Sequence, residues 1–234
     1  MNNLKIYVIH VRGEKEREKH MRQELEKFKL EAEFMLDGNK EDITPQTLTQ
    51  YFTGSMHEVS GKVSCALKHI KVYESIISNK IEQALIFEDD IILKSNFEST
   101  LHDVLEEIKE RQLSNYFISL ENSNHGYIKK HEREAGKHLY EKKQGRCAGA
   151  YLIDYQCAQS LIQEIKYNKC GEAIDWFHNQ LSEQQKITIY WAHPYLAEQG
   201  SHNGSFKSLI DNKPSGWFRK MVYYFQRVIK SKRK

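Results

Sequence analysis

Proline is scarce in this sequence and its cysteines are widely spaced, and each shortage excludes a class of protein. Three prolines in 234 residues argue against a disordered or linker-rich chain. The four cysteines form no Cys-x-x-Cys pair, and no Cys/His cluster has zinc-finger spacing. We therefore expect reduced, mostly buried thiols in a reducing compartment, at Cys65, Cys147, Cys157 and Cys170.

Long apolar segments are missing as well. No apolar run reaches the length that spans a membrane, and residues 1–17 lack the apolar core of a signal peptide. A chain of 234 residues can bury a core without the help of disulfides. We therefore expect a cytoplasmic protein with one large domain, residues 1–212, and an appendage, residues 213–234.

These two parts of the chain carry net charges of opposite sign. From Lys213 onward there are eight Lys or Arg residues and no Asp or Glu, which leaves 27 of the 35 basic residues against 32 acidic residues in 1–212. The domain is therefore mildly acidic, at −5, and the tail is strongly basic. A nucleic-acid-binding domain carries a basic face, so we expect no nucleic acid but an anionic partner at the C-terminal end.

Residues 213–234 predict an amphipathic helix. At about 100° per residue, the aromatic and aliphatic side chains fall on one broad face and most Lys and Arg side chains on the other. This pattern is typical of a helix that lies in the plane of a membrane surface. We expect peripheral binding to anionic lipid at the inner face of the cytoplasmic membrane; a last core helix packed on the domain is the alternative.

Apolar patterns alternate between strand and helix periods over residues 1–120. Strands are expected at 4–11, 31–38, 83–90 and 115–120, and helices at 13–30, 64–79 and 96–113. This alternation predicts an α/β fold of Rossmann type, with a mostly parallel sheet and helices on both faces. The second half of the chain shows a less regular succession of strands and helices.

Three adjacent carboxylates, Glu88, Asp89 and Asp90, follow the apolar residues 84–87. A short apolar run is typical of a parallel strand buried on both faces, and ligands bind beyond the carboxyl ends of such strands. Like charges this close raise one another's pKa, and a divalent cation removes that conflict. Oxygen ligands favour magnesium or manganese, with substrate phosphates completing the shell. We predict metal ligands at Glu88 and Asp90, which point to one side of an extended strand; a solvated acidic turn is the alternative.

Several short motifs follow one another in a characteristic order. They are IYVIHVRGEKEREKHM (6–21), VSCALKHIKVYESII (63–77), ALIFEDDIIL (84–93), GRCAGAYLIDYQCAQSLI (145–162), EAIDWF (172–177) and HPYLAEQGSHNGS (193–205). In this order the chain resembles glycosyltransferase family 25 over residues 4–206, a family that includes bacterial lipooligosaccharide galactosyltransferases. Two positions depart from the family: His10-Val11 stands where Asn-Leu is common, and Ser64 where glycine is frequent.

The resemblance implies a GT-A-like fold and an inverting transfer of a sugar, usually galactose, from a UDP-sugar donor. The expected acceptor is a saccharide or glycolipid of a lipooligosaccharide, a lipopolysaccharide or another surface glycan. Donor contacts are implied for His10, Arg12, Asp37, Gly38, Glu88, Asp89 and Gln199. His202 is implied as a further metal ligand beside Glu88 and Asp90. For Asp37 and Gly38 a plain turn is the alternative, and for His202 a loop histidine without a role.

The acceptor hydroxyl needs a carboxylate to take its proton in a one-step transfer. The resemblance places Asp175 in that role, with Glu172 as the reserve, and we expect Trp176 to stack on a sugar face. The alternative is that Asp175 is a surface carboxylate and Trp176 belongs to the core. We expect Arg17 to be a solvated helix charge rather than a phosphate contact, and His69 to be a satisfied helix histidine rather than a ligand.

Two other functions share some of these features. Metal-dependent nucleotidyltransferases and phosphodiesterases also cluster carboxylates, but the sequence has no P-loop and no G-x-G-x-x-G, and residues 10–17 contain a single glycine. A non-catalytic peripheral membrane scaffold would use its acidic cluster only structurally. Binding of UDP separates the scaffold from the enzymes, and analysis of the products separates the two classes of enzyme.

Overall fold

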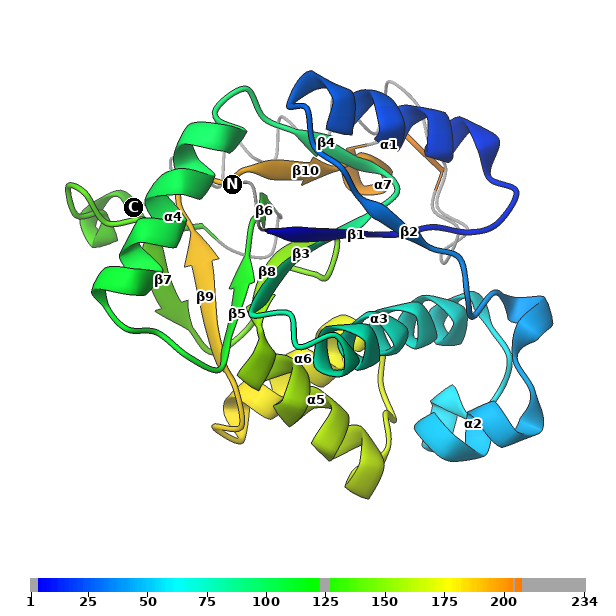
Figure 1. Ribbon diagram of the computed structural model, residues 1–234. Coiled ribbons are helices and arrows are strands. Elements are labelled where there is room, and N and C mark those ends of the chain that lie inside the picture. Colours follow the sequence, from blue (N-terminus) through cyan, green and yellow to red (C-terminus); the bar gives the residue numbers. More distant parts are fainter. Residues whose placement is uncertain (1–3, 123–126, 204, 208–234) are drawn as a thin grey trace.

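A seven-stranded sheet forms the centre of the computed structural model, which describes residues 4–122, 127–203 and 205–207 (Figure 1). The strands follow the order β2-β1-β3-β8-β5-β9-β7. Their bounds are Lys5–Ile9 (β1), Glu33–Met35 (β2), Gln83–Glu88 (β3), Tyr116–Ser119 (β5), Leu139–Lys142 (β7), Ala150–Asp154 (β8) and Thr188–Ala192 (β9). A three-stranded sheet contains Ile91–Leu93 (β4), Glu121–Asn122 (β6) and Ala197–Gln199 (β10).

Five strands of the central sheet share one direction. β1 pairs in parallel with β2 and with β3, and β5 pairs in parallel with β9. β8 runs antiparallel to both β3 and β5, which sets these two groups in the same direction, and β7 runs antiparallel to β9. The predicted α/β fold with a mostly parallel sheet is therefore confirmed, with β8 and β7 as its reversed strands.

Helices cover both faces of this sheet (Figure 1). One face carries α1 (Lys15–Lys27) and α4 (Phe97–Glu110), and the other carries α3 (Gly61–Ser78), α5 (Tyr155–Asn168) and α6 (Ile174–Glu183). The remaining helical segments are α2 (Pro45–Tyr51), α7 (Gly200–Asn203) and short 3-10 turns at Lys40–Asp42, Gly54–Met56 and Lys130–Glu132.

Strand β3 is buried on both faces, as its apolar sequence predicts. Ala84 and Ile86 belong to the core that includes residues of α3 and α5, whereas Leu85 and Phe87 belong to the core that includes residues of α1 and α4. All four side chains are fully buried, and each of the larger ones contributes about 1.5–3 kcal/mol by leaving water. The two cores together hold β3, and with it the carboxylates at its end, in one position.

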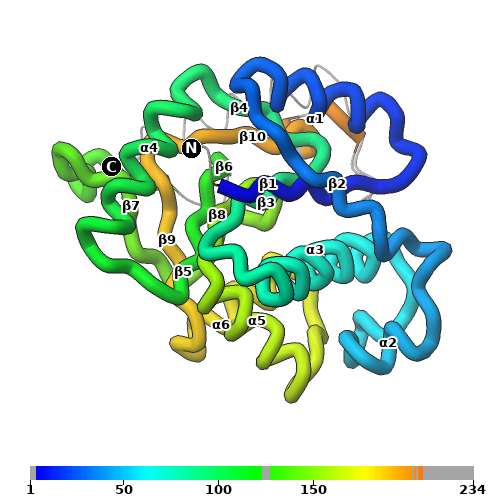
Figure 2. Tube along the Cα trace, viewed as in Figure 1, coloured from blue at the N-terminus to red at the C-terminus, as the bar shows by residue number. Residues whose placement is uncertain are grey.

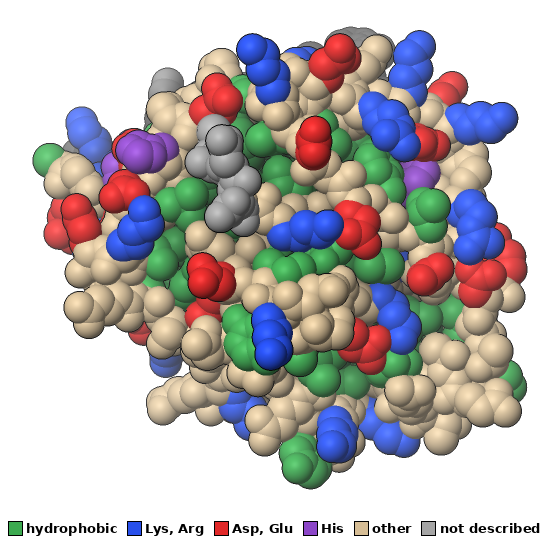
Figure 3. All heavy atoms as spheres, in the orientation of Figure 1, with side chains coloured by type: hydrophobic (Ala, Val, Ile, Leu, Met, Phe, Trp, Pro, Cys, Tyr) green, Lys and Arg blue, Asp and Glu red, His purple; other side chains and the backbone are tan. Residues whose placement is uncertain are grey.

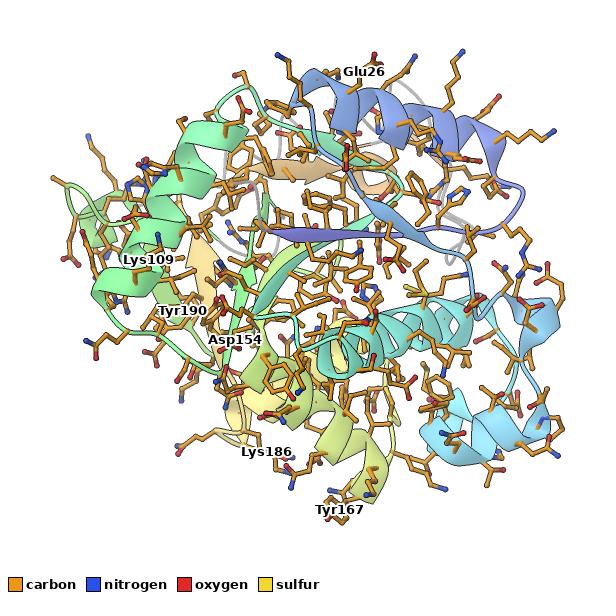
Figure 4. The ribbon with its side chains drawn as sticks, in the orientation of Figure 1. Glu26, Lys109, Asp154, Tyr167, Lys186 and Tyr190 are labelled. Atoms are coloured by element: carbon orange, nitrogen blue, oxygen red, sulfur yellow. The ribbon has the colours of Figure 1, made fainter. Side chains whose placement is uncertain are left out.

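Side-chain caps begin three of the helices, α2 at Thr44, α3 at Ser60 and α5 at Asp154. The Ser60 hydroxyl accepts a hydrogen bond from the Val63 amide at the start of α3. Asp154, which is labelled in Figure 4, accepts one from the Cys157 amide at the start of α5. Such caps contribute about 1 kcal/mol each. They satisfy backbone amides of the first turn, which otherwise lack partners within the helix.

The small sheet joins distant parts of the chain. β10 pairs antiparallel with β4 and parallel with β6, and Figure 2 shows it lying alongside β4. In this register Gln199 lies opposite Ile91, just after the carboxylates. Residues near the end of the described chain are thereby brought back to the end of β3.

The four cysteines are free thiols, as expected, with Cys157 and Cys170 buried and Cys65 and Cys147 half-buried. Among the described helices, none combines the length and the hydrophobicity that crossing a bilayer requires. Acidic and basic side chains are interspersed on the face shown in Figure 3. The amphipathic helix predicted at residues 213–234 lies outside the described residues, so that segment and the domain boundary before it stay predictions.

Candidate functional site

The three carboxylates lie where β3 ends, as predicted. Glu88 is the last residue of β3, Asp89 and Asp90 form a turn, and β4 begins at Ile91. Because the chain is not extended beyond Glu88, the alternation of an extended strand does not apply to this cluster. Arg17 lies 2.5 Å from an oxygen of Asp89 and 3.9 Å from an oxygen of Asp90, so that both aspartates approach the same guanidinium.

Both carboxylate oxygens of Asp89 contact other side chains of the protein. Oδ2 lies 2.8 Å from Nδ1 of His10, and Oδ1 accepts a hydrogen bond from Arg17 at 2.5 Å. Burial raises the pKa of the Asp89 carboxyl, but His10 and Arg17 outweigh this effect and hold the pKa below its usual value. The expectation that Arg17 is a solvated helix charge is wrong: its side chain is buried, because α1 turns it toward the end of β3, where a buried carboxylate needs a cation.

One carboxylate oxygen of Asp90 accepts no hydrogen bond from the described residues. Its Oδ2 accepts a hydrogen bond of 2.8 Å from the Ser201 amide, whereas its Oδ1 is buried and meets no hydrogen-bond donor among the described residues. Burial and the neighbouring charge of Glu88 raise the pKa of Asp90 to about 6. An unpaired, buried carboxylate oxygen is costly by itself, so this atom indicates a ligand position.

Glu88 connects the end of β3 to β10 and to α3. Its Oε2 accepts a hydrogen bond of 2.6 Å from Nε2 of Gln199, and its Oε1 lies 3.5 Å from Sγ of Cys65 and 3.6 Å from Nε2 of His69. Burial raises the pKa of the Glu88 carboxyl, but the nearby His69 outweighs this and lowers the pKa overall. The amide oxygen of Gln199 is buried and has no partner within the described part of the chain.

Helix α3 also holds the turn that follows β2. Ser64 donates a hydrogen bond of 2.8 Å to the carbonyl of Gly38, and the Lys68 ammonium donates to the carbonyls of Leu36 and Asp37 at 3.0 and 3.2 Å. Gly38 has a φ of +91°, and a Cβ there would lie 3.0 Å from Leu67. Burial lowers the pKa of Lys68 to about 8. The Asp37-Gly38 pair is therefore a tight turn clamped by α3.

One cavity of about 440 Å³ receives side chains from all of these elements. The predicted residues that line it are Glu88, Asp89, Asp90, Asp175 and Gln199. Four basic side chains also line it: Arg17, Lys40, Lys62 and Lys68. Residues that the sequence places far apart thus form one site, with acidic oxygens and cations around the same space.

Asp175 lies in the first turn of α6 and Trp176 lies beside it on the wall of the cavity. Trp176 is 62% exposed, so the alternative that placed this side chain in the core is wrong. Asp175 accepts a hydrogen bond from the Trp176 amide at 3.0 Å. Glu172, the reserve base, is exposed before α6 begins and is not among the residues that line the cavity.

Other predicted donor contacts lie beside the cavity rather than on its wall. His10 is buried behind Asp89, and Arg12 is exposed and forms an ion pair of 3.0 Å with Asp42. Asp37 and Gly38 belong to the clamped turn described above. The side chain of His202 lies outside the described residues. Donor contacts by these residues stay predictions.

Several site residues were not anticipated from the sequence. Lys68 clamps the turn after β2, and Cys65 and His69 approach Glu88, one turn apart on α3. Their four-residue spacing is a usable signal, because residues i and i+4 share one face of a helix. His69 is only partly satisfied as a helix histidine: Nδ1 lies 2.7 Å from the Tyr151 hydroxyl, but Nε2 has no hydrogen-bond partner among the described residues.

The chain matches one protein family over most of its length. The family model described as "Glycosyltransferase family 25 (LPS biosynthesis protein)" matches residues 3–178. A Haemophilus influenzae protein named "Putative glycosyltransferase" is 27% identical over 177 residues, which are 72% of this chain and 60% of that protein. A Bos taurus protein named "Probable inactive glycosyltransferase 25 family member 3" is 23% identical over 192 residues, 77% of this chain and 31% of that protein. This chain therefore covers less than two thirds of either relative.

Solved structures show a weak similarity of fold. Mouse xyloside xylosyltransferase 1, in its apo form, is 12% identical with a TM-score of 0.40, over 80% of this chain and 83% of that chain. UDP-glucose pyrophosphorylase complexed with UDP-glucose is 13% identical with a TM-score of 0.39, over 80% of this chain and 73% of that chain.

Proposed function

This chain belongs to glycosyltransferase family 25, and from that membership we propose that it is an inverting, metal-dependent enzyme that transfers a sugar from a UDP-sugar. Galactose is the first candidate for the sugar, and the acceptor is a saccharide of a lipooligosaccharide, a lipopolysaccharide or another surface glycan. The observation that carries the proposal is that the carboxylates at the end of β3 and the carboxylate of Asp175 line the same cavity.

The donor side of the cavity suits a nucleoside diphosphate. Asp90 and Glu88, with the open oxygens Oδ1 of Asp90 and Oε1 of Gln199, form a set of hard ligands that fits magnesium or manganese. Such an ion, when bound, would offset the negative charge that develops on the departing UDP. Lys40 and Lys62 also line the cavity and add positive charge there.

Asp89 has a structural role instead of a ligand role in this proposal. His10 and Arg17 contact its two oxygens and thereby fix the turn that contains Asp90.

The acceptor side is formed by the start of α6. In the proposed transfer the acceptor hydroxyl oxygen bonds to the anomeric carbon, the bond from that carbon to UDP breaks, and the hydroxyl proton passes to Asp175. A single displacement of this kind inverts the anomeric centre. The exposed indole of Trp176 beside Asp175 offers an apolar surface on which a sugar ring can stack.

The experiment is a panel of UDP-sugars offered with manganese, with and without saccharide acceptors. Release of UDP together with a glycosylated product, lost on addition of EDTA, is the expected result. Release of pyrophosphate or of a nucleoside monophosphate would identify a nucleotidyltransferase or a phosphodiesterase instead. If calorimetry detects no binding of UDP with or without manganese, the protein is a scaffold and the proposal is wrong.

A further inference from the structure

Three side chains of different chemistry meet beside the carboxylate turn: Cys65 and His69 from α3, and Glu88 from β3. The Cys65 sulfur lies 3.5 Å from Oε1 of Glu88, and Nε2 of His69 lies 3.6 Å from the same oxygen. All three ligand atoms lie within 4.8 Å of one another. From this geometry we propose that Cys65, His69 and Glu88 form a binding site for a thiophilic divalent cation of the zinc type.

The separations between the ligand atoms suit a tetrahedral ion. With a zinc–sulfur bond of about 2.3 Å and zinc–nitrogen and zinc–oxygen bonds of about 2.0 Å, neighbouring ligand atoms lie roughly 3.3–3.6 Å apart. The two separations measured from Oε1 of Glu88 are 3.5 and 3.6 Å. The 3.6 Å between Nε2 of His69 and Oε1 of Glu88 is longer than a hydrogen bond between an imidazole nitrogen and a carboxylate oxygen. In the absence of an ion, Sγ of Cys65 donates a hydrogen bond to this oxygen, and Nε2 of His69 is left without a hydrogen-bond partner among the described residues; an ion would replace the thiol proton and engage both atoms.

The contacts of His69 resemble those of a histidine that binds a metal ion. It is fully buried, and Nε2 has no hydrogen-bond partner among the described residues. Its Nδ1 lies 2.7 Å from the Tyr151 hydroxyl, which lies 2.8 Å from the Tyr73 hydroxyl, which in turn lies 2.8 Å from Nε2 of His178. This buried chain occupies Nδ1 and leaves Nε2 for the cluster. Ligating histidines commonly have such a hydrogen bond on their second nitrogen.

The site has one open side. Cys65 and His69 lie one turn apart on α3, so both point to Glu88 without any change in the helix. Cys65 and Glu88 also line the cavity, whereas His69 lies beneath them. Three protein ligands with a fourth position facing a cavity leave room for water or for an anionic group of a ligand.

The proposed site has softer ligand atoms than the set of oxygen ligands that suits magnesium or manganese. A thiolate and an imidazole select zinc-type ions, whereas carboxylate and amide oxygens select the harder ions. Asp90 and Gln199 contribute only oxygens, and Glu88 belongs to both sets. A zinc-type ion therefore competes for Glu88 and would inhibit transfer. This consequence rests on the proposed function, but binding of the cation does not.

Cobalt(II) is the probe for the experiment, because a thiolate ligand gives it a charge-transfer band in the near ultraviolet and a tetrahedral shell gives strong visible bands. The purified full chain, freed of metals, is titrated with cobalt(II) in the absence of any nucleotide. We expect both sets of bands to saturate at an equimolar amount of cobalt and to disappear when zinc is added. The measurement needs no enzymatic activity, so failure of the proposed transfer would leave it interpretable.

Two cysteines on the wall of the cavity give a matched comparison. Cys65→Ser is expected to abolish the charge-transfer band, and His69→Gln to lower the affinity for cobalt by roughly tenfold or more. Cys147→Ser is the control, because Cys147 is also half-buried and lines the cavity but does not belong to the cluster. Circular dichroism checks that each variant folds, and Cys65→Ala replaces Cys65→Ser if the latter does not. Absence of the band in the folded wild-type chain, or its persistence in the Cys65 variant, would overturn the proposal.

Discussion

Arg17 and Asp89 form a buried ion pair, with a guanidinium nitrogen of Arg17 2.5 Å from Oδ1 of Asp89. The two residues are 72 positions apart, and the pair joins α1 to the turn that follows β3. His10 contacts the second oxygen of Asp89 at 2.8 Å. One carboxylate of the cluster thus serves to fix the turn, and the other two, Glu88 and Asp90, are those of the proposed metal site.

Loss of this ion pair should destabilise the fold. Arg17→Gln is expected to lower the free energy of unfolding by about 3 kcal/mol, because Asp89 would stay buried with only its contact to His10 in place of the ion pair. Arg22→Gln is the control on the same helix, since Arg22 forms an exposed ion pair of 2.8 Å with Glu18, worth about 1 kcal/mol or less. Urea unfolding measures both variants. Equal, small losses would show that the Arg17 pair contributes no more than a surface pair.

Turnover should depend on Asp175 and not on Glu172. Asp175→Asn is expected to lower kcat roughly 100-fold or more, the usual cost of removing a general base, while binding of the UDP-sugar is preserved. Glu172→Gln is expected to behave like the wild type, because Glu172 is exposed and does not line the cavity. Steady-state kinetics with the active UDP-sugar measures both. The opposite pattern would assign the base to Glu172.

An exposed indole at the cavity should bind sugar. Trp176→Ala is expected to raise the KM for the saccharide acceptor by about tenfold, because a stacked aromatic contact contributes roughly 1 kcal/mol or more. Tyr167→Ala is the control: Tyr167 is 71% exposed and points away from the domain at the end of α5 (Figure 4). Equal KM values for the two variants would remove Trp176 from the acceptor site.

The stability of the metal-free chain should depend on pH through Asp90. Its folded pKa, about 6, lies above the ordinary value of 3.8, so its contribution to stability is full below 3.8 and is lost as the pH rises through 6. Asp90→Asn carries no charge and is expected to be more stable than the wild type by roughly 2–3 kcal/mol near pH 7, with little difference near pH 4.

Thermal unfolding in EDTA at the two pH values measures this difference. Manganese added near pH 7 is expected to stabilise the wild type and to leave the Asp90 variant unchanged, since binding to the folded state raises stability. A variant that is less stable than the metal-free wild type near pH 7 would contradict the prediction.

Membrane binding is expected to reside in residues 213–234, which lie outside the described part of the chain. The full chain should sediment with anionic liposomes and be released by salt, because each nearby basic residue contributes roughly 1 kcal/mol of attraction. A chain that ends at Lys213 should stay in the supernatant. Equal recovery of both in the supernatant, insensitive to salt, would indicate that the segment packs on the domain instead.

Local sequence patterns are enough to predict the elements that carry the site. Apolar residues 84–87 predict a strand buried on both faces, and Ala84 and Leu85 do point into the two opposite cores. The carboxylates therefore had to lie at the end of this strand, where α/β proteins bind ligands. Periodicity predicted this much because the direction of a side chain in a strand or helix depends mainly on its local position.

Which of these side chains meet depends on how the elements pack together. Helical spacing places Arg17 on the same face as Met21 and Leu25, but only the packing of α1 on the sheet brings that guanidinium against Asp89. Gln199 reaches Glu88 across 111 positions because β10 returns beside β4, and His69 lies near the same carboxylate only because α3 packs on the sheet. Such pairings depend on contacts between distant segments, whose geometry is set by packing of the whole core and not by any local pattern.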